Sequence, residues 1–297
     1  MARPHVDLPA ERRISHLNWM EFAEWVPDPI STVLVPVGTL EAHGITSLGT
    51  DNEIPTRLAE TLAERLNAFV APTIPYGVTA GLGALAGGTH VKSAAFTEYV
   101  AAVLTTLTHQ GFRNLVVMNG HGGNTDALRD VLRRVHEETG AYLATYQWWT
   151  ECYSIAEEVF GVPGGHAGVD ETAAMMTIAP DQVFADRWDP SLAFEARNSL
   201  VTFPAPGSLI YYGGKRSDPV LDSMKARVFW TRVVEHSGEL LEDLVVRWER
   251  EGFPAPRPRR GAGRGHVGHS GPGAGGGGGG NGHDKSGSGA SKKKGSS

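Results

Sequence analysis

Three side chains of the types that bind metal ions lie close together early in the chain: Glu41, His43 and Asp51. They follow the β-branched, apolar run from Val33 to Val37, which predicts a buried strand that ends where these polar residues begin. Glu41 and His43 are two residues apart, so both can point to the same side of an extended segment. Open α/β sheets bind ligands beyond the carboxyl ends of their strands. The segment therefore predicts a metal site, in which the two oxygens of Asp51 could bridge two ions.

Two further polar clusters adjoin predicted regular elements. The apolar run from Asn114 to Met118 predicts a second buried strand, which leads directly into the glycine-rich turn that contains His121. Glycines permit a close approach of the backbone, which a ligand-bearing turn between a strand and a helix requires. Further along the chain, His166 and Glu171 precede an apolar helical pattern. The three clusters could converge in one pocket.

Taken in order, these clusters contain P-x-G-T-x-E-x-H-G, then N-G-H-G-G-N, then H-A-G-x-x-E-T. The combination resembles the creatininase family of amidohydrolases, which also includes formamide deformylases and the peptidase of mycofactocin maturation. The resemblance extends from Ile14 to Trp248. It implies an α/β fold with three α/β/α layers around a mostly parallel sheet, and a site for two divalent metal ions. It also implies hydrolysis of a carbon–nitrogen bond in a small cyclic or linear amide, and a homo-oligomer, a hexamer built as a trimer of dimers.

The resemblance also implies which residues hold the metal ions. Glu41 and His121 would bind one ion, His43 would bind the other, and Asp51 would bridge the two. Creatininase carries a further glutamate two residues after the histidine of the second motif, and that position is Gly123 in this chain. The metal site must therefore be completed in another way.

The third motif offers the missing groups. Glu171 is the candidate for the remaining ligand, either by direct coordination or by holding another ligand in place. Glu171 could also be a polar residue of a first helical turn, stabilised there by the helix dipole. His166 matches the position that resembles the proton shuttle of creatininase, so His166 and Glu171 are the predicted catalytic residues.

Other positions depart from the family pattern. Most members have P-H-L-P before the bridging aspartate, whereas this chain has Ile45 to Leu48 there. His90 and Lys92 are also unusual, and a cationic Lys92 near the pocket would favour a polar or anionic ligand. Trp148 and Trp149 follow a strand-like run, and either one could line the pocket or belong to the core.

The expected chemistry can be argued from the ligand types alone. A metal ion can lower the pKa of bound water from ~15.7 to ~7, which supplies hydroxide at neutral pH, and two ions can hold this hydroxide between them and polarise a carbonyl group. An imidazole such as that of His166 could then protonate the leaving nitrogen. Nitrogen and oxygen ligands suit zinc, manganese or ferrous iron, and the resemblance favours zinc or manganese. The same hydroxide could attack a cyclitol ketone or a lactone, or serve a peptide-processing hydrolase of the mycofactocin type, and these alternatives stay open.

The remaining reactive residues are assigned structural roles. Asp170 is interpreted as a polar residue of a first helical turn, and His90, His109 and His136 as surface histidines. Cys152 is the only cysteine, so the chain has no intrachain disulfide and no zinc–thiolate site. The sequence contains neither a G-x-S-x-G serine-hydrolase motif nor a P-loop.

Composition and periodicity complete the prediction. The 297 residues carry a net charge of -6, and 40% are hydrophobic, which is typical of a soluble protein that does not bind nucleic acid. No apolar run approaches the ~18 residues of a membrane span, so we expect no membrane partner and a cytoplasmic location. The resemblance implies a small-molecule substrate. The predicted strands lie near Val33, Phe69, Leu115 and Tyr142–Gln147, and the predicted helices span residues 54–66, 96–110, 125–139 and 221–250.

The chain divides into two predicted parts. Residues 1–253 form the α/β hydrolase domain, within which the irregular, proline-bearing segment 180–219 could cover the pocket or meet a neighbouring subunit. Residues 254–297 are rich in glycine, serine and basic residues, so they cannot bury enough apolar surface to fold. This tail is either passive or binds an acidic partner, a polyanion or loosely held metal.

Overall fold

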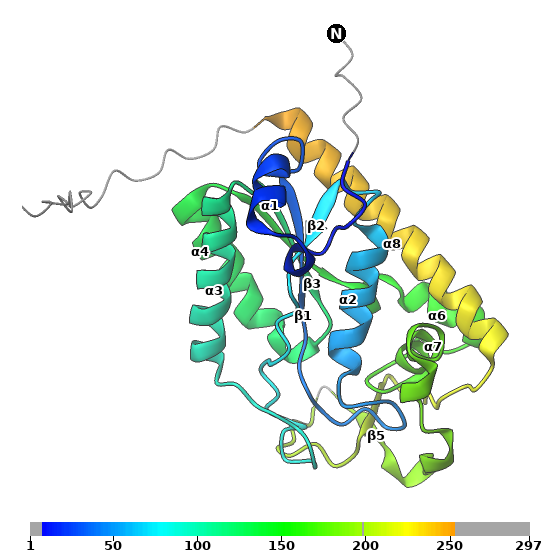
Figure 1. Cartoon of the computed structure of the whole chain (residues 1–297). Helices are drawn as coiled ribbons and strands as arrows, with labels where there is room; N and C mark the ends of the chain where they lie inside the picture. Colours follow the sequence, from blue (N-terminus) through cyan, green and yellow to red (C-terminus); the bar gives the residue numbers. More distant parts are fainter. Residues whose placement is uncertain (1–7, 198, 253–297) are drawn as a thin grey trace, which may run out of the picture. The chain divides into compact units, whose positions relative to one another are not determined.

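A four-stranded parallel sheet lies at the centre of this computed structural model, which describes residues 8–197 and 199–252 (Figure 1). The strand order is β2-β1-β3-β4, and every neighbouring pair is parallel. The strands are β1 (Thr32–Val37), β2 (Ala68–Val70), β3 (Asn114–Asn119) and β4 (Tyr142–Gln147). All four predicted strands are therefore confirmed. In the ladder, the last residue of β1 pairs with the last residue of β3, and that residue pairs with the last residue of β4, so the loops that follow them leave from one edge.

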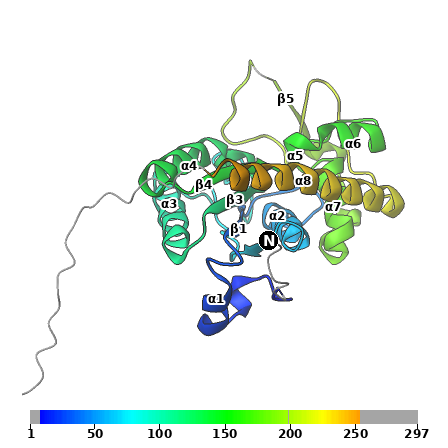
Figure 2. The ribbon, with the colours of Figure 1, turned by 90° about the horizontal axis from the view of Figure 1, so that it is seen from above.

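Helices cover both faces of the sheet (Figures 1 and 2). On one face lie α1 (Trp19–Trp25), α3 (Ser93–Gln110) and α4 (Thr125–Thr139). On the other face lie α2 (Thr50–Leu62), α6 (Tyr153–Phe160), α7 (Val169–Ile178) and α8 (Ser223–Glu251), and the short α5 (Trp148–Glu151) follows β4. The predicted three-layer α/β/α arrangement is thus confirmed.

The side chains of the strands alternate between two apolar cores. Val33 and Val35 of β1 pack in the core shared with α3 and α4, whereas Leu34 between them packs in the core shared with α2, α7 and α8. All residues of β1 and β3 are buried. This is why both strands appear in the sequence as continuous apolar runs, which is the pattern of a parallel sheet covered on both faces.

The segment 180–219 is mostly irregular, as predicted, but it contains two short strands. β5 (Ala193–Ala196) and β6 (Leu209–Tyr212) pair in parallel as a separate two-stranded sheet. Ile210 of β6 also forms an isolated bridge with His166, which ties this segment to the turn before α7. The 3-10 helices of the described residues are η1 (Ile14–His16), η2 (Gly122–Asn124), η3 (Pro180–Gln182), η4 (Ala185–Arg187) and η5 (Pro190–Leu192).

Helix α2 begins earlier than the apolar periodicity predicts. The prediction placed its start at Ile54, but the helix begins at Thr50, so Asp51 belongs to its first turn rather than to a loop. The first residues of the helix are polar and carry no apolar repeat, which is why periodicity alone missed them. This shift places the Asp51 carboxylate on a rigid element.

Two other predictions concern the ends and the surroundings of the chain. The boundary at residue 253 and the tail 254–297 fall outside the described residues, and the division into these two parts stays a prediction. None of the helices in the described part of the chain combines the length and the apolar character that a membrane span requires. The cytoplasmic location stays a prediction as well.

Candidate metal centre

The predicted site residues meet at the carboxyl ends of the parallel strands. Glu41 and His43 lie in the segment that follows β1, and His121 is the second residue after β3. Asp51 and Glu171 lie in the first turns of α2 and α7. All five side chains are buried. The structure therefore brings together every residue that the sequence analysis proposed as a metal ligand.

Backbone packing determines where Asp51 lies. Its carbonyl cannot receive the usual helical hydrogen bond from residue 55, because Pro55 has no N–H group. This carbonyl instead rests against Gly38 and Gly120, the glycines that directly follow β1 and β3. A Cβ atom would lie 2.2 Å from Asp51 O at Gly38 and 2.0 Å from it at Gly120. Only glycine fits at either position, so both motif glycines serve to seat α2 against the sheet.

The two carboxylate oxygens of Asp51 are directed at two different histidines. Asp51 Oδ2 lies 2.9 Å from His121 Nδ1, and Asp51 Oδ1 lies 2.9 Å from His43 Nε2. Glu41 Oε1 is 3.1 Å from His121 Nδ1, and Glu171 Oε2 is 3.7 Å from His43 Nε2. Two groups of potential ligand atoms, each within 4.8 Å of one another, therefore share Asp51: one with Glu41 and His121, the other with His43 and Glu171.

Backbone carbonyls orient the two histidines. His43 Nδ1 lies 3.1 Å from Glu41 O, and His121 Nε2 lies 3.0 Å from Val78 O. A carbonyl oxygen can only accept a hydrogen bond, so these nitrogens carry the protons, and the opposite nitrogen of each ring turns its lone pair toward the carboxylates. This is the arrangement in which a histidine binds a metal ion while its other nitrogen donates to a backbone oxygen.

Two buried atoms of the cluster make no hydrogen bond within the described residues: His43 Nε2 and Asp51 Oδ2. His43 Nε2 is close to Asp51 Oδ1, but the orientation is not that of a hydrogen bond. Buried polar atoms without partners cost free energy, and buried carboxylates need a compensating cation. The nitrogen and oxygen donors, with no thiolate, suit zinc or manganese. The residues present thus fit divalent metal ions.

Electrostatics support the same conclusion. Burial works to lower the pKa of His43, but the charges of Asp51, Glu171 and Glu41 outweigh it and raise that pKa to about 10. Burial also works to lower the pKa of His121, but Asp51 and Glu41 outweigh it and raise that pKa well above its ordinary value. Burial would raise the pKa of Asp51, yet His43 and His121 lower it. The cluster therefore favours positive charge at the points where the ligand atoms converge.

Glu171 is held by its own helix terminus. Its Oε2 accepts a hydrogen bond of 2.6 Å from the backbone N–H of Ala167, which adopts a positive φ of 57° in the turn before α7. Burial raises the pKa of Glu171 well above its ordinary value, although His43 acts in the opposite direction. Glu171 is thus both a residue of the first turn of α7 and a carboxylate that lies beside His43.

His166 lies at the boundary between the cluster and the pocket. Its Nε2 donates to Ala42 O at 2.8 Å, so its Nδ1 carries the lone pair, 3.5 Å from Glu41 Oε1. The side chain is 15% exposed, unlike the more deeply buried His43. Burial, and then the neighbouring His43, lower the pKa of His166 to about 4. A neutral imidazole therefore presents a proton-accepting nitrogen to the pocket.

Asp170 is a site residue that the sequence analysis interpreted as merely structural. It does lie in the first turn of α7, but it is buried, lines the pocket and accepts a hydrogen bond of 3.1 Å from the N–H of Gly165. Burial raises the pKa of Asp170 to about 7, while that hydrogen bond acts against the shift. No sequence signal distinguishes it from a solvated helix-cap residue, because its burial comes from the loops packed over α7.

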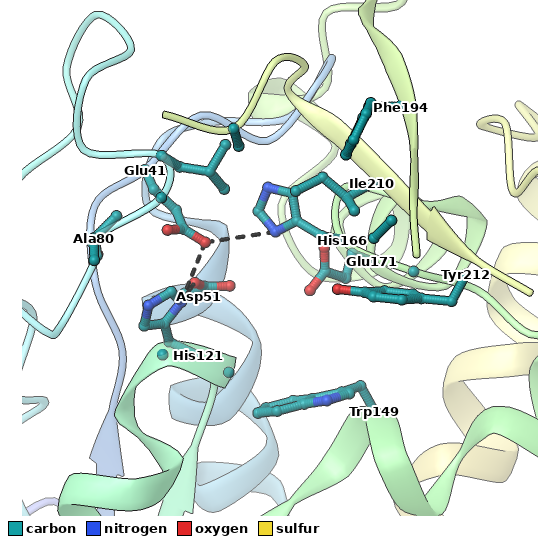
Figure 3. Close-up of a pocket in the computed structure, with 18 of the residues that line it drawn as sticks. Glu41, Asp51, Ala80, His121, Trp149, His166, Glu171, Phe194, Ile210 and Tyr212 are labelled. Carbon is teal, nitrogen blue, oxygen red and sulfur yellow. Dashed lines mark ion pairs between the residues drawn. The ribbon is translucent and has the colours of Figure 1, made fainter. Parts of the chain in front are cut away.

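The ligand groups open onto a pocket of about 490 Å³ (Figure 3). Trp149 lines this pocket, whereas Trp148 is fully buried in the core, which decides between the two predicted alternatives. The expectation that Lys92 lies near the pocket is wrong: Lys92 is exposed at the start of α3 and is not part of the lining. The predicted surface histidines His90, His109 and His136 are all exposed.

The aromatic and aliphatic lining from the segment 180–219 could not be predicted residue by residue. Phe194 and Ile210 come from β5 and β6, and Tyr212 ends β6. These strands have four residues each and no alternation that identifies a pocket face. The only available signal was the position of this segment after the third motif.

The family model for creatininase, described as creatinine amidohydrolase, matches residues 15–240. The chain belongs to the creatininase family. As a member of this family, it is a hydrolase. The resemblance inferred from the three motifs is confirmed.

The proteins to which this chain is similar have several different activities. Creatinine amidohydrolase from Pseudomonas putida is 28% identical over 223 residues, which cover 66% of this chain and 85% of the relative. The mycofactocin precursor peptide peptidase of Mycobacterium ulcerans (strain Agy99) is 30% identical over 179 residues, or 54% of this chain and 64% of the relative. The 3-dehydro-scyllo-inosose hydrolase of Thermotoga maritima is 36% identical over 93 residues, or 30% of each chain.

Solved creatininases share the fold. A mutant creatininase complexed with creatine has a TM-score of 0.65 and 24% identity, and the match covers 79% of this chain and 99% of that one. Other solved creatininases are described as a Zn-Zn type and as a manganese form. These structures support divalent metal ions as the cofactors of the family to which this chain belongs.

The most informative departure of this creatininase-family member is Gly123. A Cβ atom at this position would lie 2.2 Å from Val78 O and 2.5 Å from His121 Nε2. Val78 O is the carbonyl that accepts the hydrogen bond from His121. The backbone contact that orients His121 thus occupies the space that a side chain at residue 123 would need. Glu171, not residue 123, is the acidic group that the structure places beside His43 and Asp51.

Proposed function

We propose that this protein is a dinuclear, metal-dependent amidohydrolase that cleaves a carbon–nitrogen bond of a small cyclic or linear amide. The observation that carries the proposal is the pair of ligand groups that share the Asp51 carboxylate. Two buried carboxylate oxygens directed at two histidines are what a bridging ligand requires. The pocket beside them gives a substrate direct access to this centre.

In this proposal Glu41, His121 and Asp51 Oδ2 hold one ion, and His43, Asp51 Oδ1 and Glu171 hold the other. The zinc and manganese forms of solved creatininases support these two metals. Bound divalent cations supply Lewis acidity, which makes water acidic enough to react at neutral pH and polarises a carbonyl group. The backbone hydrogen bonds to both histidine rings keep their lone pairs directed inward.

His166 is proposed to handle the proton. Its Nδ1 faces the pocket side of Glu41, and the hydrogen bond from Nε2 to Ala42 O fixes the ring in that orientation. With its lowered pKa the imidazole is neutral near pH 7, so Nδ1 can accept the proton released by water and return it to the leaving nitrogen. Glu41, 3.5 Å away, would stabilise the transient imidazolium.

The substrate class is supported by the relatives. The similar proteins act on creatinine and on a precursor peptide, and both reactions break a carbon–nitrogen bond. A second candidate is hydrolysis of a cyclitol ketone or lactone, favoured by the stretch that is 36% identical to 3-dehydro-scyllo-inosose hydrolase. Both candidates use the same centre, because cations activate a carbonyl group whatever atom leaves.

Metal analysis tests the centre. We expect about two zinc or manganese ions per chain in the purified protein. The content should fall toward zero in Asp51→Asn, because the amide has the shape of the carboxylate but lacks the negative charge that binds both ions. The matched control is Asp126→Asn, since Asp126 also lies in a first helical turn but is exposed. Unchanged metal content in Asp51→Asn would contradict the bridging role.

Turnover tests the reaction. The metal-loaded protein is assayed with two classes of substrate. The amides are creatinine, a hydantoin and N-formyl amides, and the compounds without a scissile carbon–nitrogen bond are a cyclitol ketone and a lactone. Release of an amine or opening of an amide ring supports the proposal. Turnover confined to the ketone or lactone would establish the second candidate instead.

We also propose that the protein is a homo-oligomer, and a hexamer by analogy with its family. Light scattering coupled to size-exclusion chromatography measures the mass directly. A mass equal to that of a single chain would contradict this part of the proposal.

A further inference from the structure

We propose that the substrate is a neutral amide that carries a bulky apolar group, aromatic or branched aliphatic, and no carboxylate. This inference rests on the proposed function and adds the chemical class of the substrate. Its basis is one part of the pocket lining, which we name the apolar wall. The apolar wall consists of Trp149, Phe194, Leu200, Phe203, Ile210 and Tyr212.

The apolar wall borders the same space as the candidate ligands. Figure 3 shows Phe194 and Ile210 beside His166, Tyr212 beside Glu171, and Trp149 facing the group from another side. The bridge between Ile210 and His166 fixes β6 next to the proton-handling residue. An amide whose carbonyl lies over the ligand groups must therefore place its substituents against this wall.

Parts of the apolar wall are uncovered in the single chain. Phe203 is 71% exposed, Leu200 is 52% exposed and Tyr212 is 51% exposed, although all three line the pocket. Apolar side chains gathered at the mouth of a polar pocket are typical of a surface that receives a ligand. A substituent with its own apolar area would remove this surface from water, which favours binding.

The side chains of the lining offer no counter-charge to an acidic substituent that lies against the apolar wall. Among the described residues that line the pocket, none is a lysine or an arginine, and Lys92 lies elsewhere on the surface. Asp170, which belongs to neither ligand group, is buried on the lining and accepts a hydrogen bond from the backbone N–H of Gly165. A substrate carboxylate that lies against the apolar wall, away from the candidate metal ligands, would lose its hydration without gaining a counter-charge from the protein.

Size points in the same direction. A pocket of about 490 Å³ falls in the range of ~300–1,000 Å³ that is typical of sites for drug-sized ligands. A single small ring such as creatinine would leave most of the apolar wall in contact with water. A substrate with an additional phenyl-sized or isobutyl-sized group fills this space and covers the wall.

Binding of hydroxamates tests the inference without knowledge of the natural substrate. Acetohydroxamate, 3-phenylpropanohydroxamate and succinate monohydroxamate carry the same metal-binding head and differ in the attached group. Their dissociation constants are measured by calorimetry on the metal-loaded protein. We expect the phenyl compound to bind roughly ten- to one-hundred-fold more tightly than acetohydroxamate, as burial of a phenyl group implies, and the succinate compound to bind more weakly than acetohydroxamate.

Variants of the wall give the structural control. Ile210→Ala and Phe194→Ala are made separately, and the ratio of the acetohydroxamate constant to the phenyl constant is compared with that of the wild type. Using this ratio cancels any general change in metal affinity. We expect it to fall about threefold or more in each wall variant, and to stay unchanged in Val228→Ala, an exposed apolar position of α8 outside the pocket.

The possible failures are distinguishable. Equal affinities for the phenyl and acetyl compounds, or tighter binding of the succinate compound, would overturn the inference and leave the proposed hydrolase intact. A preference for phenyl that persists in both wall variants would also overturn it. A protein that holds no metal ions and binds none of the three compounds would overturn the proposed function, and this inference with it.

Discussion

The close contact between Gly120 and helix α2 allows a sharp test of how the metal centre is assembled. A Cβ atom added at Gly120 would lie 2.0 Å from Asp51 O and 2.7 Å from Pro55 Cγ. Contacts between a Cβ atom and an oxygen essentially never fall below 3.0 Å, so Gly120→Ala must move the turn that carries His121 and the first turn of α2 apart by about 1 Å. Metal–ligand distances tolerate only about 0.2 Å. The carboxylate of Asp51 would therefore leave the position that both ligand groups share.

Two magnitudes follow for Gly120→Ala. Overpacking of this kind costs about 1–3 kcal/mol, and in a domain of this size each kcal/mol lowers Tm by roughly 2–4 °C. Loss of ligand geometry is expected to weaken metal binding by roughly tenfold or more, as found when groups that support a metal ligand are removed. Metal content after dialysis, measured by mass spectrometry, and calorimetric Tm check the two effects.

The same turn provides the matched control. Gly122 is two residues away, and a Cβ atom there would have no neighbour within 4 Å, so Gly122→Ala is expected to retain its metal ions and its Tm. If Gly120→Ala also keeps both, the packing of Asp51 O against Gly120 does not position the carboxylate, and this account of the site is refuted.

Three further predictions follow from the site. Glu171→Gln is expected to lower the metal content to about one ion per chain, and adding Gly123→Glu should not restore it, because Val78 O occupies the space of the new side chain; recovery of the second ion would contradict this. His166→Gln is expected to lower kcat by roughly 10²–10⁴-fold with metal content unchanged, and an unaltered kcat would remove His166 from the reaction. In the metal-free protein the pKa of His43 is raised from 6.5 to about 10, so its ion pairs contribute stability that is complete below pH 6.5 and is lost as the pH rises toward 10. Tm of the metal-free protein should therefore fall over that interval while metal affinity rises, since the ligand is the neutral imidazole, and a flat Tm profile would argue against this.

Much of the fold and of the candidate site follows from local pattern. Residues of β1 and β3 are buried on both faces, so their apolar runs are continuous and identify strands without any knowledge of neighbours. The spacing of Glu41 and His43 and the glycine-rich turn around His121 are equally local, and the structure places these side chains together. Such features are visible in a sequence because the residues that act together are close in the chain.

Other features depend on segments that meet only in the folded chain. The loops that pack over the ends of the strands decide three of these features. They bury Asp170, they leave Trp149 rather than Trp148 on the pocket, and they place Lys92 outside it. The reason for glycine at residue 123 is a carbonyl more than forty residues away in the chain. The sequence alone therefore determined the four strands of the central sheet, the approximate positions of α3, α4 and α8, and the candidate metal-binding groups. Only the tertiary structure decided which groups face one another and what surrounds them, because burial and contact across long stretches of chain are properties of packing and leave no periodic trace in the sequence.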